Sequence, residues 1–521
     1  MLNNATRLNR MSLIHPPWID VTDDHPILAL TPESADAAPH RPGRRSPPYP
    51  TMKPHDLAVP VATASSTPTW LQPQFVFLAL AATFGLAVLF ANAPFLAADE
   101  SDHFFRAFQL SQGTIIGEKL GDRSGGRLPA LANKDMGNIP FHYENKMSRE
   151  LFRRTLDPVF VDWSKLPRVF SPFPHTVVYA PPGYIPQVAA IVVGKFAHVG
   201  PLGLMYLARL AGFATCIWLG RSALRILPAY RWSCLVLLLC PMSLYLMGSV
   251  ASDGVMIGCA WLMLALLLRM TGEKRPPATG ELVVLLALAC ILATAKLVYL
   301  PLAGLVPLFV LPRLSRPRQR VIFGLAFILT SVLPVWVWSR VIASIFVPGR
   351  TDIPIDPIAQ GHYMAAHPVG FLSLMANSIW VKADFIYRYF VGVLGWGDTL
   401  LPTWFYPVFG WGLLACVVAE SSRVIDVRWS HRLFFAAAAA ATVLMIYAAQ
   451  YASWNSPGSQ EVIDGIQGRY FLPVAPLVIL GFPSLRKIRI PALAAPVLGT
   501  LLAATGAAVC LWAVIARFYI A

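Results

Sequence analysis

The sequence predicts an all-α polytopic membrane protein with about eleven transmembrane helices. Hydrophobic residues make up 56% of the 521 residues and charged residues only 13%, which lies outside the range of soluble globular proteins. Many apolar runs approach or exceed the roughly 18 to 20 residues that a helix needs to cross the hydrocarbon core. Basic residues occupy the short links between these runs.

Residues 1–70 differ in composition from the rest and are expected to form a disordered cytoplasmic tail. Segments such as TPESADAAPHRPGRRSPPYP are rich in Pro, Ala and Ser, and they offer too little apolar surface to offset the entropy of ordering. An alternative is a later start at Met52. No signal peptide precedes the tail, so the first apolar run is expected to stay as an anchor helix, and residues 71–521 are expected to form the transmembrane domain.

The transmembrane helices are expected where the chain is continuously apolar. In chain order these segments are 74–93, 202–220, 233–250, 254–270, 281–295, 298–312, 321–343, 403–420, 432–451, 470–484 and 491–517. Two further apolar stretches are left out because charged residues interrupt them. Lys195 lies within 184–200, and Lys382 and Asp384 lie within 371–395, so both stretches are expected as amphipathic helices at the outer interface.

The basic residues of alternate links predict the orientation of the chain. Six clusters are found: Arg41, Arg44, Arg45 and Lys53; Arg221, Arg225 and Arg231; Arg269, Lys274 and Arg275; Arg313, Arg316, Arg318 and Arg320; Arg423, Arg428 and Arg432; Arg486, Lys487 and Arg489. With eleven spans all six fall on one face, which the positive-inside rule identifies as cytoplasmic. The formal net charge of +15 thus reflects topology and contact with the lipid bilayer, and we expect no nucleic-acid partner.

The opposite face is expected to receive a large first periplasmic loop, about 94–201, a second long loop, about 344–402, and a short one near 452–469. The carboxylates, and the cations that do not belong to the six basic clusters, are expected to lie on this face. We therefore place the candidate site there. The seven cysteines lie within or beside apolar runs without CxxC or zinc spacing, which indicates packing residues and neither disulfides nor metal ligands.

Asp99 and Glu100 follow the first span directly and are candidate catalytic carboxylates. In a helix over 99–110, His103 lies four residues from Asp99 and Arg106 lies one turn further, so these side chains share one flank. A carboxylate at a partly dry interface suits general-base chemistry. The alternative is a helix N-terminus, where acidic side chains act as caps or favour the dipole.

Three further ionisable residues complete the candidate set, each with a structural alternative. Asp253 separates two apolar spans and either serves function or caps the second span. Lys296 ends a short span and either binds a phosphate or extends to the headgroup region. Arg469, in QGRYFLP, suits a phosphate, or else it pairs with Glu461 or Asp464. Walker, GxGxxG, HExxH and GxSxG motifs are absent from the sequence, so soluble-type nucleotide and hydrolase chemistry has no support.

Five segments, in order, resemble the bacterial family of predicted membrane proteins DUF2142. They are APFLAADESDHFFRAFQLSQG, VVYAPPGYIPQVAAIVVGKFAHVG, YLARLAGFATCIWLG, LCPMSLYLMGSVASDG and QGRYFLPVAPL, and the resemblance runs over about 90–480. That family is similar to the GT-C glycosyltransferases, which use polyprenyl-phosphate-linked sugars. The resemblance implies a GT-C-like fold with juxtamembrane helices in the first outer loop.

Carried over residue by residue, the acidic motif of those enzymes falls on Asp99 and Glu100. Their Pro-Pro segment falls on Pro181 and Pro182, and the acidic residue after the third span falls on Asp253. Here the chain lacks the WWDYG acceptor motif and a large soluble C-terminal domain, so the resemblance implies no acceptor.

The resulting expectation is a glycosyltransferase of the bacterial inner membrane that acts at its outer, periplasmic or extracellular, face on a cell-envelope glycan or lipid. Asp99 is expected to act as the base, with Glu100 and Asp253 in support. The expected substrate and phosphate ligands are His103, Arg106, Lys296, Gln467, Arg469 and Tyr470. No cofactor is firmly implied, and a divalent metal on Asp99, Glu100 and Asp253 stays open. The alternatives are a transporter or flippase of lipid-linked sugars or envelope polymer, and a non-catalytic envelope-assembly protein.

Overall fold

The computed structural model describes residues 71–130, 146–156, 158–273, 275–350, 352–422, 429–459, 461–485 and 489–520. All of these residues lie in one compact unit, Ser66–Ala521. The expected N-terminal tail, residues 1–70, lies outside the described residues. Several members of the basic clusters, among them Lys274, Arg423, Arg428, Arg486 and Lys487, lie outside them too.

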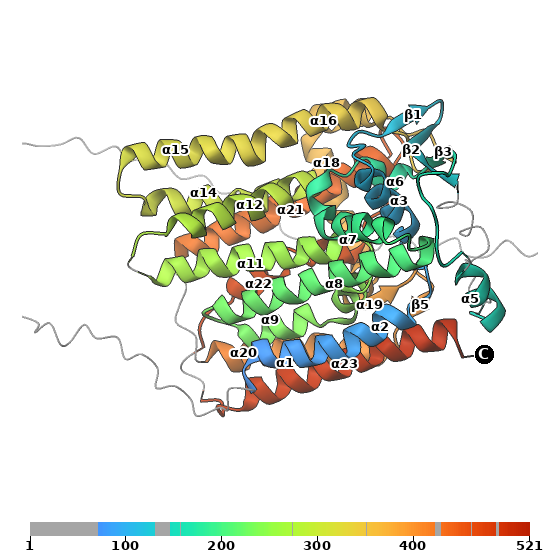
Figure 1. Ribbon diagram of the computed structural model, residues 1–521. Helices are drawn as coiled ribbons and strands as arrows, with labels where there is room; N and C mark the ends of the chain where they lie inside the picture. The colour runs from blue at the N-terminus through green and yellow to red at the C-terminus, as the bar shows by residue number, and fades with distance from the viewer. Residues whose placement is uncertain are drawn as a thin grey trace, which may run out of the picture. The chain divides into compact units, whose positions relative to one another are not determined.

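The described chain is mostly helical, as the sequence predicts, and six of its helices are long and apolar enough to cross a membrane (Figure 1). Two of the six contain a π-helical turn, a rare conformation that occurs mostly as a single turn inside longer α-helices. The six are α1–η3–α2 (Pro73–Leu80, Ala81–Gly85, Leu86–Ala91), α8 (Pro201–Ile226), α11 (Asp253–Gly272), α15–η8–α16 (Pro317–Phe327, Ile328–Val332, Leu333–Ile345), α21 (Trp429–Trp454) and α23 (Ala494–Phe518).

The other five expected spans are shorter or broken helices, so the predicted count of about eleven is not confirmed. They correspond to α9 and α10 (Arg231–Leu238, Pro241–Met247), α12 (Thr279–Ala295), η6–α13–α14–η7 (Leu297–Tyr299, Leu300–Ala303, Leu305–Val310, Leu311–Arg313), α20 (Phe405–Ser421), and η9 with α22 (Gly468–Phe471, Ala475–Leu480). Proline causes much of this shortening, since Pro241, Pro301 and Pro307 cannot donate the backbone hydrogen bonds of a continuous helix.

The two apolar stretches that we excluded from the spans have different structures. Residues 185–196 form α7 (Ile185–Phe196), a helix of 12 residues. The second stretch forms α18 (Pro368–Val381) and α19 (Ala383–Gly392), which meet at an angle of 66°. Taken together α18 and α19 are apolar enough for one broken span or a re-entrant loop, which raises the number of membrane-capable segments to at most seven.

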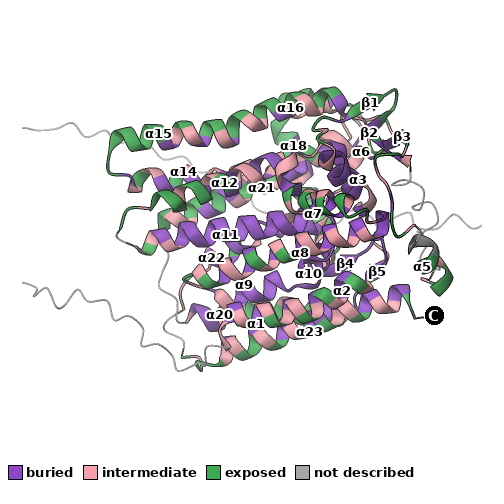
Figure 2. Ribbon diagram, in the orientation of Figure 1, coloured by how far each residue is buried: buried purple, intermediate pink, exposed green. Residues whose placement is uncertain are grey.

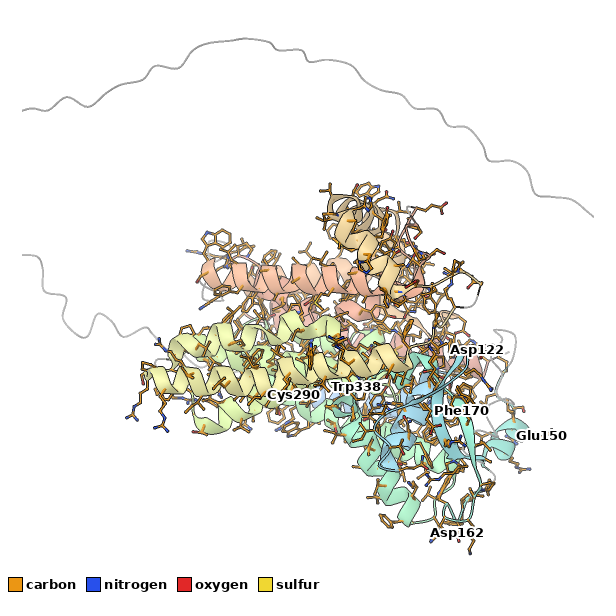
Figure 3. All side chains as sticks on the ribbon, turned by 90° about the horizontal axis from the view of Figure 1, so that it is seen from above. Asp122, Glu150, Asp162, Phe170, Cys290 and Trp338 are labelled. Carbon is orange, nitrogen blue, oxygen red and sulfur yellow. The ribbon has the colours of Figure 1, made fainter. Side chains whose placement is uncertain are left out.

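The outer segments carry small elements that the sequence analysis only partly predicts. The expected helix over 99–110 is α3 (Glu100–Ser111), followed by α5 (Arg149–Leu156), α6 (Pro174–Val177), η5 (Pro181–Tyr184) and, in the second long loop, α17 (Pro357–Ala366). The prediction of an all-α fold misses two small antiparallel sheets: β1-β2-β3 (Glu118–Leu120, Arg123–Pro129, Arg168–Pro172) and β4-β5 (Val393–Leu394, Thr399–Leu400). Figure 3 views this part of the chain from above and labels Phe170 on β3 and Asp122 in the turn between β1 and β2.

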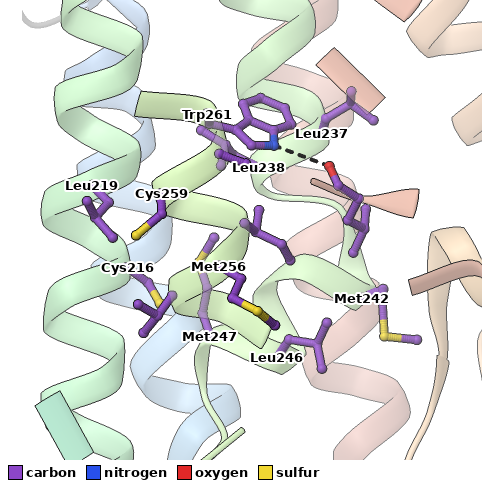
Figure 4. Packing of buried hydrophobic residues seen from close by; sticks show 14 of the residues in the cluster. Cys216, Leu219, Leu237, Leu238, Met242, Leu246, Met247, Met256, Cys259 and Trp261 are labelled. Atoms are coloured by element: carbon purple, nitrogen blue, oxygen red, sulfur yellow. Dashed lines mark hydrogen bonds between the residues drawn. The ribbon is translucent and has the colours of Figure 1, made fainter. Parts of the chain in front are cut away.

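The core is centred on α11, which is buried along nearly its whole length, whereas α15–α16 is largely exposed on the outside (Figure 2). Helix α11 packs along α8 because Gly258 leaves room for Leu219: a Cβ at position 258 would lie 2.8 Å from the Leu219 Cβ. Figure 4 shows the apolar packing around α11, where the Trp261 Nε1 atom donates to the Leu472 carbonyl at 3.2 Å.

The two ends of α11 differ in chemistry. Its Gly272 end carries arginines that pair with Glu281, through Arg269 and Arg275, and the Arg313 guanidinium donates to the Glu273 carbonyl at 2.7 Å. Because α11 has 20 residues, its Asp253 end lies about 30 Å from its Gly272 end. The candidate site residues lie at that second end.

Candidate functional site

The described residues enclose a cavity of about 570 Å³ at the Asp253 end of the bundle. This volume lies within the range of cavities that hold small organic ligands. Its lining comes from distant parts of the sequence, including the loop before α3, the turn after α12, the ends of α16 and α21, and the segment around η9. Of the nine candidate residues, those that line it are Asp99, Lys296, Gln467, Arg469 and Tyr470.

Asp99 is the residue directly before α3, and its backbone has a left-handed conformation with φ of 58°. Aspartate is one of the few non-glycine residues that adopt this region readily. Its side chain makes no capping hydrogen bond to α3, so the helix-cap alternative does not describe it. Its carboxylate instead accepts a hydrogen bond of 3.1 Å from Arg469, and about a quarter of the side chain remains exposed.

The electrostatic surroundings keep Asp99 ionised at neutral pH. Burial alone would raise its pKa, but electrostatic interactions, chiefly with the Arg469 guanidinium, outweigh burial and bring the pKa below its usual value. The neighbouring Asp102 behaves oppositely. Burial raises the pKa of Asp102 to about 6, with His175 acting against this rise and Asp99 adding to it.

Arg469 lies in η9 and is almost fully buried, with 9% of its side chain exposed. Gly468 makes this position possible, because a Cβ there would lie 2.1 Å from backbone atoms of Ile386 and Phe390 in α19. One guanidinium nitrogen binds Asp99, and the Nε atom has no hydrogen-bond partner among the described residues. Arg469 therefore pairs with neither Glu461 nor Asp464, and it keeps a donor for a further acceptor.

Lys296 follows the last residue of α12 and pairs with Asp253, the first residue of α11. The Lys296 Nζ atom lies 2.7 Å from an Asp253 carboxylate oxygen, and both side chains are largely buried. The ammonium group also lies 5.3 Å and 5.4 Å from the ring centroids of Tyr179 and Tyr470. This lysine does not extend to the surface, and of the pair only Lys296 lines the cavity.

Glu100 does not line the cavity, although it follows Asp99 directly in sequence. Its side chain is fully buried and forms an ion pair with Arg209 of α8, with contacts of 2.7 Å and 2.5 Å. It also accepts a hydrogen bond of 3.0 Å from the Val250 amide. These contacts tie the start of α3 to α8 and place Glu100 behind the cavity wall. The expected supporting role of Glu100 in catalysis stays a prediction.

His103 and Arg106 are also buried behind the cavity and do not line it. The His103 ring contacts the Tyr184 hydroxyl at 2.6 Å, and burial lowers the pKa of His103 to about 4 despite the opposing effect of Asp253. Arg106 donates to the Tyr179 carbonyl at 2.8 Å and to the Ile115 carbonyl at 2.9 Å. These contacts join α3 to other parts of the first outer loop, and neither residue lines the cavity.

Sequence reasoning missed most of the aromatic and amide lining and the residue Arg209. Among these lining residues are Tyr179, His175, Tyr245, Tyr389, Trp396, Gln450 and Trp454. Nothing in the sequence spacing of these residues distinguishes a cavity lining from an ordinary membrane interface. Arg209 carried a usable signal, because a charged residue inside an apolar helix requires a partner.

The three carboxylates considered for a divalent metal do not form one ligand set. Glu100 is bound by Arg209, Asp253 by Lys296 and Asp99 by Arg469. Within the described part of the chain, no group of three or more His, Cys, Asp or Glu side chains is placed to hold a metal ion.

The cavity brings together one ionised carboxylate, two cations and an apolar wall. Lys296 and Arg469 can bind an anionic group such as a phosphate. Asp99 can accept a proton, and the aromatic side chains can pack against a ring. Met242 and Leu246 of α10, Phe346 after α16 and Ile446 of α21 form part of the apolar wall. This arrangement suits an amphiphilic ligand with an anionic headgroup.

Comparison with known proteins identifies one family model. The model described as "Predicted membrane protein (DUF2142)" matches residues 82–478. No curated protein and no solved structure matches the chain. The matched region includes Asp99, Asp253, Lys296 and Arg469.

Proposed function

We propose that this chain, which belongs to the DUF2142 family of predicted membrane proteins, is a membrane glycosyltransferase. It moves a sugar from a polyprenyl-phosphate donor to a cell-envelope glycan or lipid acceptor. The observation that carries this proposal is the convergence of Asp99, Lys296 and Arg469 on one cavity with an aromatic and apolar wall. In this proposal the two cations bind the phosphate, the aromatic side chains pack against the sugar ring, and the apolar wall contacts the lipid chain.

Asp99 serves as the general base in the proposed reaction. An acceptor hydroxyl attacks the anomeric carbon of the sugar, and the bond from that carbon to the phosphate oxygen breaks. The hydroxyl proton passes to Asp99, and the polyprenyl phosphate leaves with the electron pair. General-base assistance of this kind typically contributes 10²- to 10⁴-fold to a rate.

The lowered pKa of Asp99 makes it a weak base in the free protein. In this proposal, binding of the donor raises the basicity of the Asp99 carboxylate. Arg469 is the nearest positive charge acting on Asp99, at 3.1 Å. A phosphate bound to Arg469 shares that positive charge, which weakens its pull on Asp99 and raises the basicity of the carboxylate. The base therefore gains strength when the donor is in place.

Lys296 and Arg469 stabilise the leaving phosphate in this proposal. The Nε atom of Arg469, which has no hydrogen-bond partner among the described residues, supplies a donor for the phosphate. Lys296 keeps its ion pair with Asp253, which holds the ammonium group at the cavity wall. Charge placed in advance at the leaving group stabilises the transition state without reorganisation during the reaction.

We further propose that the cavity faces the outside of the bacterial inner membrane, with the N-terminus in the cytoplasm. The arginines at the Gly272 end of α11 and the carboxylates at its Asp253 end support this orientation under the positive-inside rule. In this orientation a polyprenyl tail stays in the bilayer while its headgroup enters the cavity from the membrane side.

A deletion strain complemented with variants tests the proposal. The parent strain is compared with deletion strains that carry wild type, Asp99→Asn or Asp384→Asn. Asp384 is the matched control, since its exposed carboxylate pairs with Arg388 on α19 and does not line the cavity. Lipid extracts and surface glycans are analysed by mass spectrometry, and protein levels are measured in membranes.

We expect the deletion and the Asp99→Asn strains to accumulate a polyprenyl-phosphate sugar and to lack one surface decoration. Wild type and Asp384→Asn should restore both. If Asp99→Asn is present at the wild-type level and restores the decoration fully, Asp99 is not the base. If the polymer itself accumulates inside the cell, the chain is a transporter and the proposal is wrong.

A further inference from the structure

A second cavity, of about 510 Å³, lies at the opposite end of α3 from Asp99. Residues at the end of α3 and at the end of α7 line it, together with the turn at Asp162 and the edge of the β1-β2-β3 sheet. Figure 3 labels Asp162 in this part of the outer loop. No residue lines both cavities, and the length of α3, 12 residues, separates them by about 18 Å.

Two cations line this second cavity without a carboxylate partner in the described part of the chain. The Lys195 Nζ atom donates to the Ser111 carbonyl at 3.2 Å and contacts the Ser111 hydroxyl at 3.3 Å. Arg168 projects from β3 and is exposed. Burial lowers the pKa of Lys195, and the positive charge of Arg168 lowers it further. Two like charges that repel each other in this way favour binding of an anion between them.

The other polar groups of the cavity strengthen its preference for an anion. The Gln112 Nε2 atom is buried and has no acceptor among the described residues, and a buried donor without a partner is costly. Asp162 is the acidic residue of the lining, but its carboxylate is already bound by Lys165 at 2.8 Å and by the Ser164 hydroxyl at 2.6 Å. The net charge that the cavity presents is therefore positive.

Exposed apolar side chains surround this positively charged cavity. Val193 and Phe196 of α7 are 67% and 83% exposed, and Phe160, which pairs with Val199 in a β-bridge, is 74% exposed. Helix α8 begins at Pro201, five residues after Phe196, and α8 is one of the membrane-capable helices. The end of α7 therefore lies at a membrane interface, where exposed apolar groups beside cations are typical of contact with anionic lipid.

We propose that this second cavity binds the phosphate headgroup of an anionic phospholipid. Lys195, Arg168 and the Gln112 amide donate to the phosphate oxygens. Val193, Phe196 and Phe160 contact the acyl chains of the same lipid. The site is separate from the reaction cavity, and it does not depend on glycosyl transfer.

Native mass spectrometry of the purified full-length chain tests this site. Delipidated protein in detergent is titrated with phosphatidylglycerol, and separately with phosphatidylcholine of the same acyl chains. We expect wild type to retain phosphatidylglycerol preferentially. Lys195→Gln and Arg168→Gln should each weaken that binding about fivefold, since a basic residue near anionic lipid contributes about 1 kcal/mol.

The control variant is Arg123→Gln with Arg127→Gln, which removes two exposed cations of β2 outside the cavity and should leave binding unchanged. Arg168→Gln is decisive on its own, because its exposed side chain makes no hydrogen bond or ion pair with the described residues and its loss should leave the fold intact. Equal retention by wild type and Arg168→Gln, or equal retention of the two lipids, overturns the proposal. Displacement of phosphatidylglycerol by an excess of inorganic phosphate alone would show a free-phosphate site instead.

Discussion

The adjacent carboxylates Asp99 and Glu100 have entirely different surroundings. Asp99 precedes α3 in a left-handed conformation and its side chain reaches Arg469, whereas Glu100 is the first residue of α3 and pairs with Arg209. The sequence shows only that the two are neighbours. The different backbone conformations of Asp99 and Glu100 turn their side chains in different directions, so only Asp99 lines the cavity.

Asp102 provides a residue-scale prediction about pH and stability. Its pKa is raised to about 6, chiefly by burial, and one carboxylate oxygen has no hydrogen-bond partner among the described residues. Between about pH 4 and pH 6 the folded state therefore holds this proton more tightly than the unfolded state. The free energy of unfolding falls as pH rises through this range, and the loss is complete above pH 6.

We expect Asp102→Asn to abolish the fall in the free energy of unfolding that wild type shows as pH rises from about 4 to 6. At pH 7.5 the variant should have a free energy of unfolding about 3 kcal/mol higher than wild type, and at pH 4 the two should be similar. Thermal unfolding of both proteins in detergent across this pH range measures the difference. A constant difference at all pH values would show that Asp102 does not titrate near pH 6.

At the scale of elements, length and hydropathy predict a helix well where the chain is uninterrupted. Each of six expected segments corresponds to one long helix, whose ends lie at most three positions inside the expected bounds: 74–93, 202–220, 254–270, 321–343, 432–451 and 491–517. The prediction is weaker where tertiary packing decides the outcome. The run at 233–250 is divided before Pro241, and the run at 298–312 contains several prolines, so proline was an available signal for both breaks.

The sheet β1-β2-β3 could not be predicted from local pattern. Its strands have 3, 7 and 5 residues. The two-residue turn at Gly121 and Asp122 joins β1 to β2, whereas β2 pairs with β3 across a long stretch of sequence. Strands this short carry little periodic signal of their own. The pairing of β2 with β3 brings Arg168 to the second cavity. Because this pairing could not be predicted from the sequence, the position of Arg168 at that cavity could not be predicted either.

Gly468 gives a prediction at the scale of elements, because it sets the contact between η9 and α19. A Cβ at this position would lie 2.1 Å from backbone atoms of Ile386 and Phe390. Since backbone atoms cannot move aside singly, Gly468→Ala should displace η9 and lower the free energy of unfolding by about 1 to 3 kcal/mol. Thermal unfolding of the purified variant measures this change.

Gly361→Ala is the matched control, since a Cβ at position 361 meets no atom within 4 Å. Because Gly361 lies inside α17, where alanine is about 0.5 to 1 kcal/mol more favourable than glycine, this control should unfold at or slightly above the wild-type temperature. If Gly468→Ala also unfolds at the wild-type temperature, α19 and η9 are not in close backbone contact, and the placement of Arg469 loses its structural basis.

At the scale of the whole molecule, the fold brings together groups from widely separated parts of the chain. Asp99 precedes the first outer helix and Arg469 lies near the end of the family match, yet the two form an ion pair. The sequence predicts that these residues share one face, because the basic clusters define the other. It does not predict which of them meet, since helix packing determines the pairs Asp99–Arg469 and Asp253–Lys296.

Distance-dependent cross-linking tests this convergence most directly. In a cysteine-free background, Asp99→Cys combined with Arg469→Cys is treated with a short bifunctional thiol reagent in intact membranes, followed by proteolysis between the two sites. The pair Asp99→Cys with Arg269→Cys, near the opposite end of α11, is the control. We predict rapid cross-linking of residues 99 and 469 and none in the control. Absence of the 99–469 product, while each cysteine reacts singly from opposite sides of the membrane, would contradict the shared site.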